Sequence, residues 1–292
     1  MLILPIAVAA LPASVAQAPQ TDAVRYDNRG RPVIAVKVNA RGPFDMVVDT
    51  AAQTSLIAPA LAAELGIAAM DETMAVNGAT GSTRAQVYPV DRFASGLFDE
   101  REIGILAFPN PESTPARGIV GMDLFADRKL VFDRAAGRIA VLPSAPATDG
   151  FVAHRGEVRG GTLLLVPLIL DGVSVKALID TGAAVSIANP AARKALGWAA
   201  DDPRLVRTGA ISGATSAGAA VSRAEMATFK LGPVTLRRVP LLFSDRPIAE
   251  SIARSDEPMV IIGADLLNLL DAYAVDFPRA ELQIRIPRPP AR

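Results

Sequence analysis

Two aspartates in this chain share the same local sequence and could act together as an acid–base pair. Asp49 follows Val47-Val48, Asp180 follows Leu178-Ile179, and a threonine comes next in both cases. The apolar pairs anchor a strand in a core, so each carboxylate is held at a strand end. If the two loops meet on a two-fold axis, the carboxylates cannot both ionise at neutral pH and share one proton. The ionised member can then deprotonate a water while the protonated member polarises an amide carbonyl.

The residues around these aspartates could fix the geometry of such a pair. The hydroxyl groups of Thr50 and Thr181 can bond to backbone groups of the opposite loop and thereby cross-link the two loops. Ile119-Val120-Gly121 and Ile261-Ile262-Gly263 are expected to pack beneath the loops, because glycine allows another backbone to approach closely.

The two motifs belong to an internal repeat. The offset of 131 residues between Asp49 and Asp180 also relates Ser55 to Ser186, Pro59 to Pro190, and Leu65-Gly66 to Leu196-Gly197. Gly121 and Gly263 differ by 142 positions, so a few residues were inserted between the motifs. Two glycine-rich turns, at 77–81 and 212–215, lie between them in the same order. The chain is therefore a duplicated unit of roughly 120 residues.

Each repeat is predicted to be mostly β-structure. Val33–Val38 and Leu163–Leu170 are apolar runs that end in turn sequences, so each Asp-Thr lies at the end of the return strand of a hairpin. Short helices are expected over Pro59–Leu65 and Pro190–Leu196, since proline suits the first helical position. Each half should close with a strand pair, Leu130–Asp133 with Arg138–Val141 and Tyr273–Phe277 with Glu281–Ile286.

The domain organisation follows from the repeat. We expect an N-terminal lobe over 24–143, a linker over 144–150 and a C-terminal lobe over 151–287. Asp123 and Asp265 also recur in the two lobes, directly before short apolar segments. They are expected to cap short helices there.

Composition excludes several classes of site. Thirty basic residues balance thirty acidic ones and no local Lys/Arg cluster occurs, so no nucleic-acid partner is expected. The absence of cysteine removes disulfides, thiolate nucleophiles and cysteine metal sites. His154 is the only histidine, which argues against multi-histidine zinc sites and Ser-His-Asp chemistry. Acid–base work would therefore fall to carboxylates, with no metal.

The first residues are predicted to be a targeting segment. An apolar run at 2–11 is followed by small residues, which predicts a signal peptide over 1–16, with cleavage after Ala18 as an alternative. A buried N-terminal strand is the other interpretation, because the run lacks the expected basic residue. Export to the periplasm or outside the cell is the expectation. No later stretch reaches about 18 apolar residues, so no stable membrane span is expected after cleavage.

These motifs together resemble the aspartic protease family, in which an apolar-apolar-Asp-Thr-Gly loop and a later apolar-apolar-Gly segment define each lobe. Ala183 after Asp180-Thr181-Gly182, and glycine-rich tips without tyrosine at Gly78 and Gly213, resemble the retropepsin-like members. Retropepsins are homodimers of one short lobe each, whereas this chain carries both lobes. The resemblance implies a bilobed pepsin- or retropepsin-like acid protease fold with β-barrel-like lobes. It also implies a monomeric endopeptidase with a peptide cleft, a peptide or protein substrate and no cofactor.

The resemblance also implies a role for each motif residue. Asp49 and Asp180 would be catalytic, and Thr50, Ala51, Thr181 and Gly182 would support their loops. Gly121 and Gly263 would pack the loops. Gly78, Ala79, Thr80, Gly213, Ala214 and Thr215 would form two flaps over the substrate.

One residue departs from the family pattern. Ala51 stands where the first loop of the family has glycine. If that position needs a positive φ or close backbone contact, Ala51 strains or opens the loop; if φ is negative, its N–H donor is kept and little is lost. The alternative function is therefore a non-catalytic homologue that keeps the bilobed cleft to bind a peptide or protein.

Overall fold

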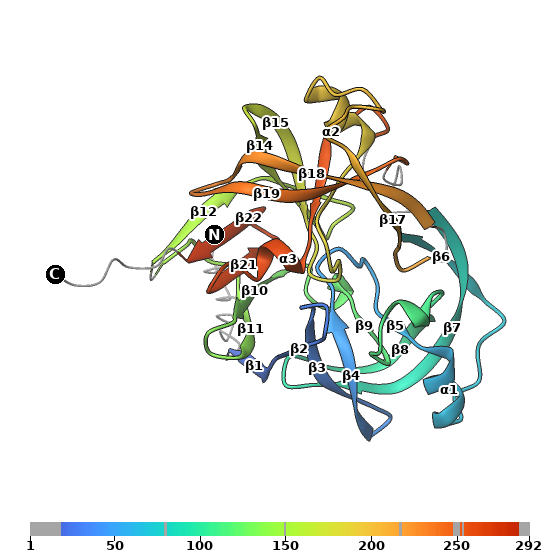
Figure 1. Cartoon of the computed structure of the whole chain (residues 1–292). Helices are drawn as coiled ribbons and strands as arrows, with labels where there is room; N and C mark the ends of the chain where they lie inside the picture. Colours follow the sequence, from blue (N-terminus) through green and yellow to red (C-terminus); the bar gives the residue numbers. More distant parts are fainter. Residues whose placement is uncertain are drawn as a thin grey trace, which may run out of the picture.

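The computed structural model describes residues 19–78, 81–148, 150–215, 218–247, 252 and 254–285. Two β-rich lobes flank a third sheet, with the N-terminal lobe below the C-terminal lobe in Figure 1. The leader predicted over 1–16, the flap residues Ala79 and Thr80, and residues 286–287 lie outside the described residues. In the part of the chain that is described, no helix has the length and apolar character needed to cross a membrane.

The N-terminal lobe is an eight-stranded sheet in the order β2-β3-β4-β9-β5-β8-β7-β6, and an additional β3–β7 pairing folds it toward a barrel. Its strands are β2 (Arg25–Tyr26), β3 (Pro32–Val38), β4 (Arg41–Val48), β5 (Leu56–Ile57), β6 (Thr73–Gly78), β7 (Gly81–Ala94), β8 (Asp99–Ala107) and β9 (Gly118–Val120). Its helices are α1 (Pro59–Leu65) and the 3₁₀ turns η1 (Pro111–Ser113) and η2 (Met122–Leu124).

The C-terminal lobe repeats this order strand for strand, as β13-β14-β15-β20-β16-β19-β18-β17 with an additional β14–β18 pairing. Its strands are β13 (Glu157–Arg159), β14 (Leu163–Leu170), β15 (Val173–Ile179), β16 (Ile187–Ala188), β17 (Val206–Ser212), β18 (Gly218–Leu231), β19 (Val234–Ser244) and β20 (Met259–Ile262). Its helices are α2 (Pro190–Ala195) and α3 (Ala264–Leu267). The predicted fold, mostly β with two pseudo-symmetric lobes, is confirmed.

Local sequence explains the hairpins that carry the two Asp-Thr motifs. The β14–β15 turn places Asp171 at φ 44° and Gly172 at φ 85°. Two successive positive φ values are typical of the turn whose twist matches the flanking strands. The turn between β3 and β4 does the same with Asn39 at φ 49° and Ala40 at φ 62°. The second strand of each hairpin, β4 or β15, therefore lies inside its sheet, between the first strand of the hairpin and a short parallel strand.

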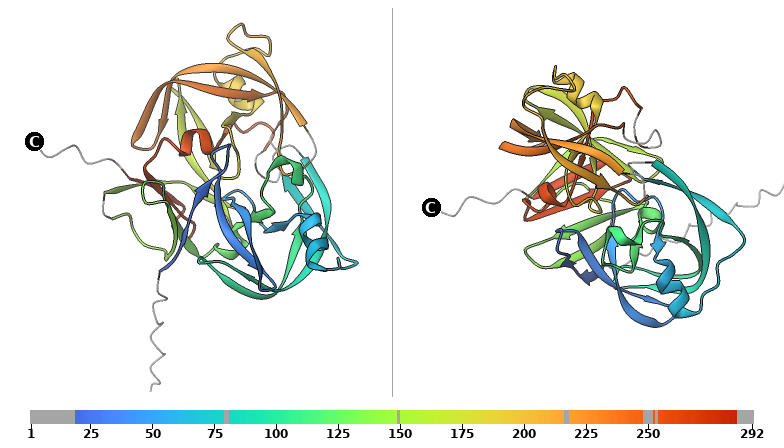
Figure 2. Two further views of the ribbon diagram at one scale, coloured as in Figure 1. Left: turned by 60° about the horizontal axis from the view of Figure 1, so that its bottom comes forward. Right: turned by 45° about the vertical axis from the view of Figure 1, so that its right-hand side comes forward.

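A six-stranded sheet joins the lobes, in the order β1-β11-β10-β21-β22-β12 (Figure 2). Its strands are β1 (Gln20–Ala23), β10 (Arg128–Asp133), β11 (Arg138–Pro143), β12 (Phe151–Arg155), β21 (Ala272–Asp276) and β22 (Glu281–Arg285). The closing strand pair expected in each half is present. The two pairs also join each other, because β10 is antiparallel to β21, with Leu130 opposite Val275.

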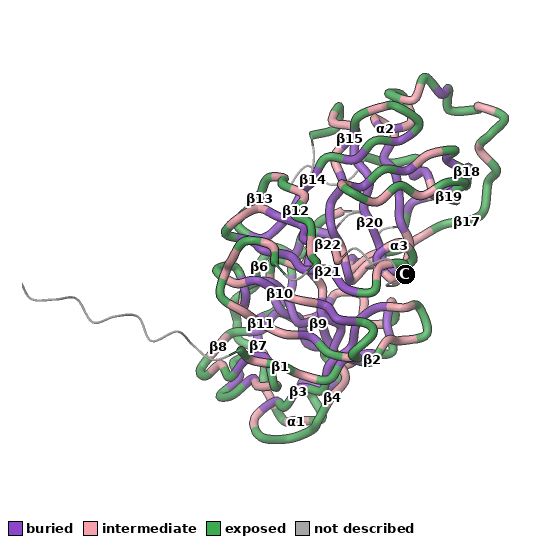
Figure 3. Tube along the Cα trace, turned by 90° about the vertical axis from the view of Figure 1, so that its left-hand side faces the viewer, coloured by how far each residue is buried: buried purple, intermediate pink, exposed green. Residues whose placement is uncertain are grey.

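The core runs through all three sheets. Phe132 of β10 stacks on Tyr273 of β21 with ring centroids 4.9 Å apart, on the face of the joining sheet that packs into the lobes. The opposite face holds the buried Asp276, which accepts hydrogen bonds from the Ser144 hydroxyl at 2.7 Å and the Ala145 amide at 3.1 Å. Figure 3 shows buried residues along the strands of both lobes and of the joining sheet, with exposed residues mainly in the turns.

Candidate active site

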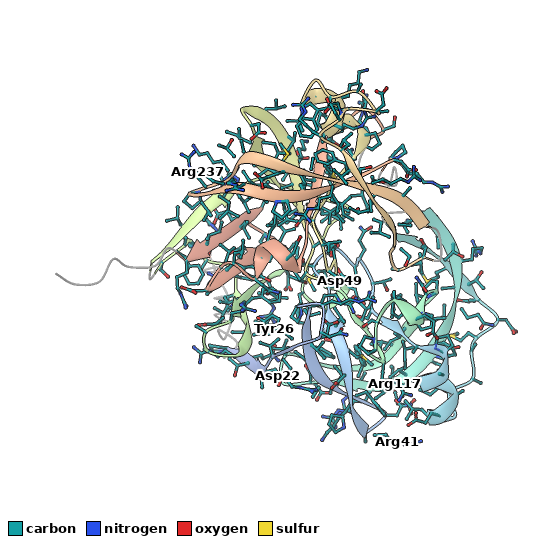
Figure 4. All side chains as sticks on the ribbon, viewed as in Figure 1. Asp22, Tyr26, Arg41, Asp49, Arg117 and Arg237 are labelled. Atoms are coloured by element: carbon teal, nitrogen blue, oxygen red, sulfur yellow. The ribbon has the colours of Figure 1, made fainter. Side chains whose placement is uncertain are left out.

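Asp49 and Asp180 lie at the ends of the central strands β4 and β15, where the two lobes meet; Figure 4 labels Asp49 there. Each central strand is parallel to a short strand that ends in the apolar-apolar-Gly segment, β9 in the first lobe and β20 in the second. The Asp49 amide donates to the Val120 carbonyl at 3.0 Å, and the Asp180 amide donates to the Ile262 carbonyl at 3.0 Å. Equivalent hydrogen bonds to a neighbouring strand therefore hold the two loops in matching positions in the two lobes.

The two threonines lock the loops to each other across the lobes. The Thr50 hydroxyl donates to the Ile179 carbonyl at 2.7 Å and accepts from the Thr181 amide at 3.1 Å. The Thr181 hydroxyl donates to the Val48 carbonyl at 2.7 Å and accepts from the Thr50 amide at 3.0 Å. Both side chains are buried, so water cannot replace these bonds. The expected hydroxyl-to-backbone cross-link is present.

The two carboxyl groups are hydrogen-bonded to each other through their side chains, and each also accepts hydrogen bonds from its own loop. Asp49 Oδ1 accepts from the amides of Ala51 at 2.8 Å and Ala52 at 3.0 Å. Asp180 Oδ1 accepts from the amide of Ala183 at 2.8 Å, and the Gly182 amide also bonds to this carboxyl group, so each aspartate has two backbone donors. Each aspartate stays partly exposed, because the pair opens into a cleft while protein surrounds its other sides.

The pair favours a state with one negative charge. Burial raises the pKa of Asp49, and the Ala51 and Ala52 amides oppose that rise by bonding to the charged form. Burial and then the neighbouring Asp49 charge raise the pKa of Asp180 well above its usual range. Like charges in contact disfavour double ionisation, so the pair holds one proton.

Ala51 fits its loop without backbone strain. It is not among the residues with positive φ, and its N–H is directed at Asp49. Its methyl group packs against an apolar cluster of the C-terminal lobe (Leu163, Leu165, Leu178, Ile252, Met259 and Ile261). The equivalent Gly182 has no such freedom, because a Cβ there would overlap the Asp49 carboxylate. Alanine is therefore accommodated in the first loop and excluded from the second.

A serine and an aspartate support each loop from below. The Ser55 hydroxyl accepts from the Gly121 amide at 3.1 Å and donates to Asp123 Oδ1 at 3.0 Å. In the second lobe, the Ser186 hydroxyl accepts from the Gly263 amide at 2.9 Å and donates to Asp265 Oδ1 at 2.6 Å. The glycines are needed, because a Cβ at Gly121 would lie 2.5 Å from the Thr54 carbonyl carbon.

The helix-capping role expected for Asp123 and Asp265 is wrong. The residues at the helix starts are Gly121 and Gly263, without a side-chain capping bond, and both carboxylates accept from serine hydroxyls. Asp265 Oδ1 also accepts from the amide of the next residue, Leu266, at 2.9 Å. The serine and aspartate supports could have been found from the sequence, because Ser55 and Ser186 share the repeat offset and an aspartate follows each glycine.

A cleft of about 660 Å³ opens above the two aspartates. Its walls are apolar on both sides, with Phe108 and Ile119 from the first lobe and Leu178 and Ile261 from the second. Three residues predicted to be in the flaps line it, namely Gly78, Gly213 and Ala214. Across the residues that the structure describes, no group of three or more carboxylate or imidazole side chains could hold a metal ion.

The described residues of the two flaps contact each other. Thr215 of the second flap is buried, and a Cβ at Gly78 of the first flap would lie 3.2 Å from its Cγ2 atom. Asn110 of the first lobe donates its side-chain amide to the carbonyls of Gly213 at 2.9 Å and Thr215 at 3.4 Å. The second flap is therefore anchored on the opposite lobe. Ala79 and Thr80 lie outside the described residues.

The threonine lock gives a stability prediction. Thr181→Val keeps the shape of the side chain but leaves the Val48 carbonyl and the Thr50 amide without partners. We expect the free energy of unfolding to fall by about 2–4 kcal/mol, since buried unpaired groups retain their full desolvation penalty. Thr235→Val, at an exposed position of β19, should change it by less than about 0.5 kcal/mol. Equal denaturant midpoints for the two variants would contradict the lock.

The raised pKa of Asp180 gives a pH prediction. A carboxyl with a raised pKa in the folded state stabilises the fold below its ordinary pKa, and that stabilisation is lost as pH rises through the raised pKa. Asp180→Asn cannot ionise, so it does not lose this stabilisation. Its free energy of unfolding should rise by about 1 kcal/mol or more relative to that of the wild type between pH 4 and pH 7. Asp91→Asn, in solvent, should show no such gain. If the melting temperatures of the wild type and of Asp180→Asn change with pH in parallel, the pKa of Asp180 is not raised.

Comparison with known proteins agrees with this geometry. The aspartyl protease family model matches residues 34–124 and 166–266, which together make up well over half of the chain. The first segment contains Asp49 and Gly121, and the second contains Asp180 and Gly263. A search of the curated proteins found no match. Because two copies of the motif, two matched segments and two equivalent lobes coincide, this chain belongs to the aspartyl protease family and carries two retropepsin-like lobes in one polypeptide.

Proposed function

We propose that the protein is an endopeptidase that hydrolyses peptide bonds with a water activated between Asp49 and Asp180. The observation that carries this proposal is the hydrogen-bonded carboxyl pair at the floor of a cleft between two lobes. The apolar walls on both sides suit a peptide with apolar side chains around the bond that is cut. No cofactor takes part in this scheme.

In the proposed reaction Asp49 is the ionised member of the pair and Asp180 the protonated one, because the pKa of Asp180 is raised further. Ionised Asp49 takes a proton from the water as the water oxygen bonds to the carbonyl carbon. Asp180 gives its proton to the carbonyl oxygen, which forms a diol. Asp49 then passes its proton to the amide nitrogen while Asp180 recovers one from a diol hydroxyl. The carbon–nitrogen bond breaks, an acid and an amine leave, and the starting state of the pair is restored.

The proposal also covers the oligomeric state and the location of the protein. Both aspartates come from one chain, so a monomer suffices, with lobes over 24–143 and 151–287. We also propose that the leader over 1–16 directs export to the periplasm or outside the cell. The alternative function is a non-catalytic peptide-binding homologue, which the following measurements separate from a protease.

Each aspartate should be indispensable for cleavage. Asp49→Asn and Asp180→Asn should each lower kcat/KM by at least about 1,000-fold, because residues that act as a unit fail together. The assay is mass-spectrometric detection of products from a mixed peptide library, from about pH 3 to pH 7. Asp91→Asn is the matched control. A single variant with near-wild-type turnover would exclude the shared-proton mechanism, and wild-type binding without cleavage would favour the alternative function.

Ala51 and Gly182 make a reciprocal test of the two loops. Ala51→Gly should change kcat/KM by less than about threefold, because the residue has no strained backbone to release. Gly182→Ala should abolish cleavage, because its Cβ would displace the Asp49 carboxylate. Circular dichroism would show that both variants fold. A large rise in the activity of Ala51→Gly, or an active Gly182→Ala variant, would mean that the loops are arranged differently in solution.

A further inference from the structure

One turn of the N-terminal lobe brings two arginines to the cleft. The turn spans Asp27 to Arg31, and both Arg29 and Arg31 line the cleft wall. Apart from Asp49 and Asp180, they are the only charged residues among the described residues that line it. Neither guanidinium gives or takes a proton in the proposed hydrolysis.

The two arginines are in different situations. Arg31 is buried, and its Nε donates to Asp27 Oδ2 at 2.8 Å, so its charge is already paired. Arg29 is exposed, and its Nη1 donates to the Ser113 carbonyl at 3.0 Å, which orients the guanidinium without neutralising it. Within the described ranges, no carboxylate forms an ion pair with Arg29.

The turn that carries Arg29 is held from several sides. The Asp27 carboxylate accepts from the amides of Arg29 and Arg31, both at 2.9 Å. The Asn268 side-chain amide, which follows α3 of the opposite lobe, donates to the Gly30 carbonyl at 2.8 Å. The Arg29 backbone is therefore fixed before any peptide enters, which lowers the entropic cost of using its side chain.

The internal repeat is broken at this turn. Gly30 and Gly161 are equivalent and share a left-handed conformation, at φ 81° and 85°. The repeat offset places Gly160 opposite Arg29 and Thr162 opposite Arg31. At the second turn the Gln53 side chain occupies the space, donating to the Gly160 carbonyl at 2.9 Å. One turn thus presents a free cation to the cleft, and its counterpart is neutral.

We propose that Arg29 determines substrate specificity by binding a carboxylate of the peptide, so that the preferred substrates carry an acidic residue at a fixed distance on one side of the bond that is cut. This rests on the proposed function and goes further, because it names the substrate class and the direction in which the peptide lies. A guanidinium binds a carboxylate through two parallel hydrogen bonds. A bound peptide also covers the cleft and excludes water, which strengthens the contact.

The test uses peptide pairs that differ only by Glu or Gln, with the acidic residue moved one position at a time along both sides of the cleavage site. The wild type should prefer the Glu peptide by about 10-fold in kcat/KM at one position, as expected for a hydrogen bond between charged groups. Arg29→Gln should bring that ratio close to one, and Arg29→Glu should shift the preference to a Lys peptide. Raising salt to about 0.5 M should reduce the wild-type ratio.

Two controls identify the source of the effect. Arg237→Gln, at an exposed position of β19 that lies away from Asp49 in Figure 4, should leave the wild-type ratio unchanged. Each peptide is tested with a free and with an amidated C-terminus. A preference that survives amidation assigns the carboxylate to the acidic side chain. One that disappears on amidation assigns it to the chain end and overturns the acidic-residue form of the proposal.

Binding measurements separate this proposal from the proposed function. Calorimetry with the same Glu and Gln pairs, in which a reduced amide replaces the scissile bond, needs no turnover. Cleavage of both peptides at equal rates, with equal binding, would overturn the role of Arg29 and leave the protease intact. Tighter binding of the Glu analogue that depends on Arg29, without any cleavage, would uphold the carboxylate site in a binding protein.

Discussion

The structure depends on holding two carboxyl groups in contact, which is an unfavourable arrangement in itself. Side by side and largely surrounded by protein, Asp49 and Asp180 repel each other when both are charged. The rest of the fold opposes their separation. The buried hydroxyls of Thr50 and Thr181 bridge the lobes, serine–aspartate pairs fix the segments below, and a continuous sheet joins the lobes behind the site. Such preorganisation keeps the shared proton available for chemistry.

Much of this architecture could be predicted from the sequence because it was present twice. The repeat offset located both aspartates, both threonines and both supporting glycines, and hairpin and helix signals placed them at strand ends. The pairing that forms the joining sheet could not be predicted in this way. Each closing strand pair looks complete locally, and only the tertiary structure shows that β10 pairs with β21. The error at Asp123 has a similar origin, because a local capping preference was overridden by a serine that is distant in sequence.

For features that differ between the copies, the sequence raised the question but could not answer it. Ala51 could either strain its loop or fit it, and only the structure shows that its methyl group packs against the opposite lobe, while a Cβ at Gly182 would overlap Asp49. The buried ion pair of Arg31 with Asp27 has no counterpart in the second lobe, since the repeat has Thr162 at the position equivalent to Arg31. In a symmetric homodimer each substitution would appear at both places. A single chain is free of that restriction, so its two halves can become different.

The pairing of β10 with β21 also has a consequence for biosynthesis. β10 is completed early, but its partner strand is made about 140 residues later, which takes roughly 7 to 28 seconds at usual rates of translation. Through that interval the nascent N-terminal half has an unsatisfied strand edge next to apolar side chains such as Phe132. Unprotected edges of this kind recruit other chains. The C-terminal half of the chain, which is made last, therefore covers the exposed edge of β10 in the N-terminal half. A chain truncated before β21 would keep that edge exposed and would be prone to aggregate.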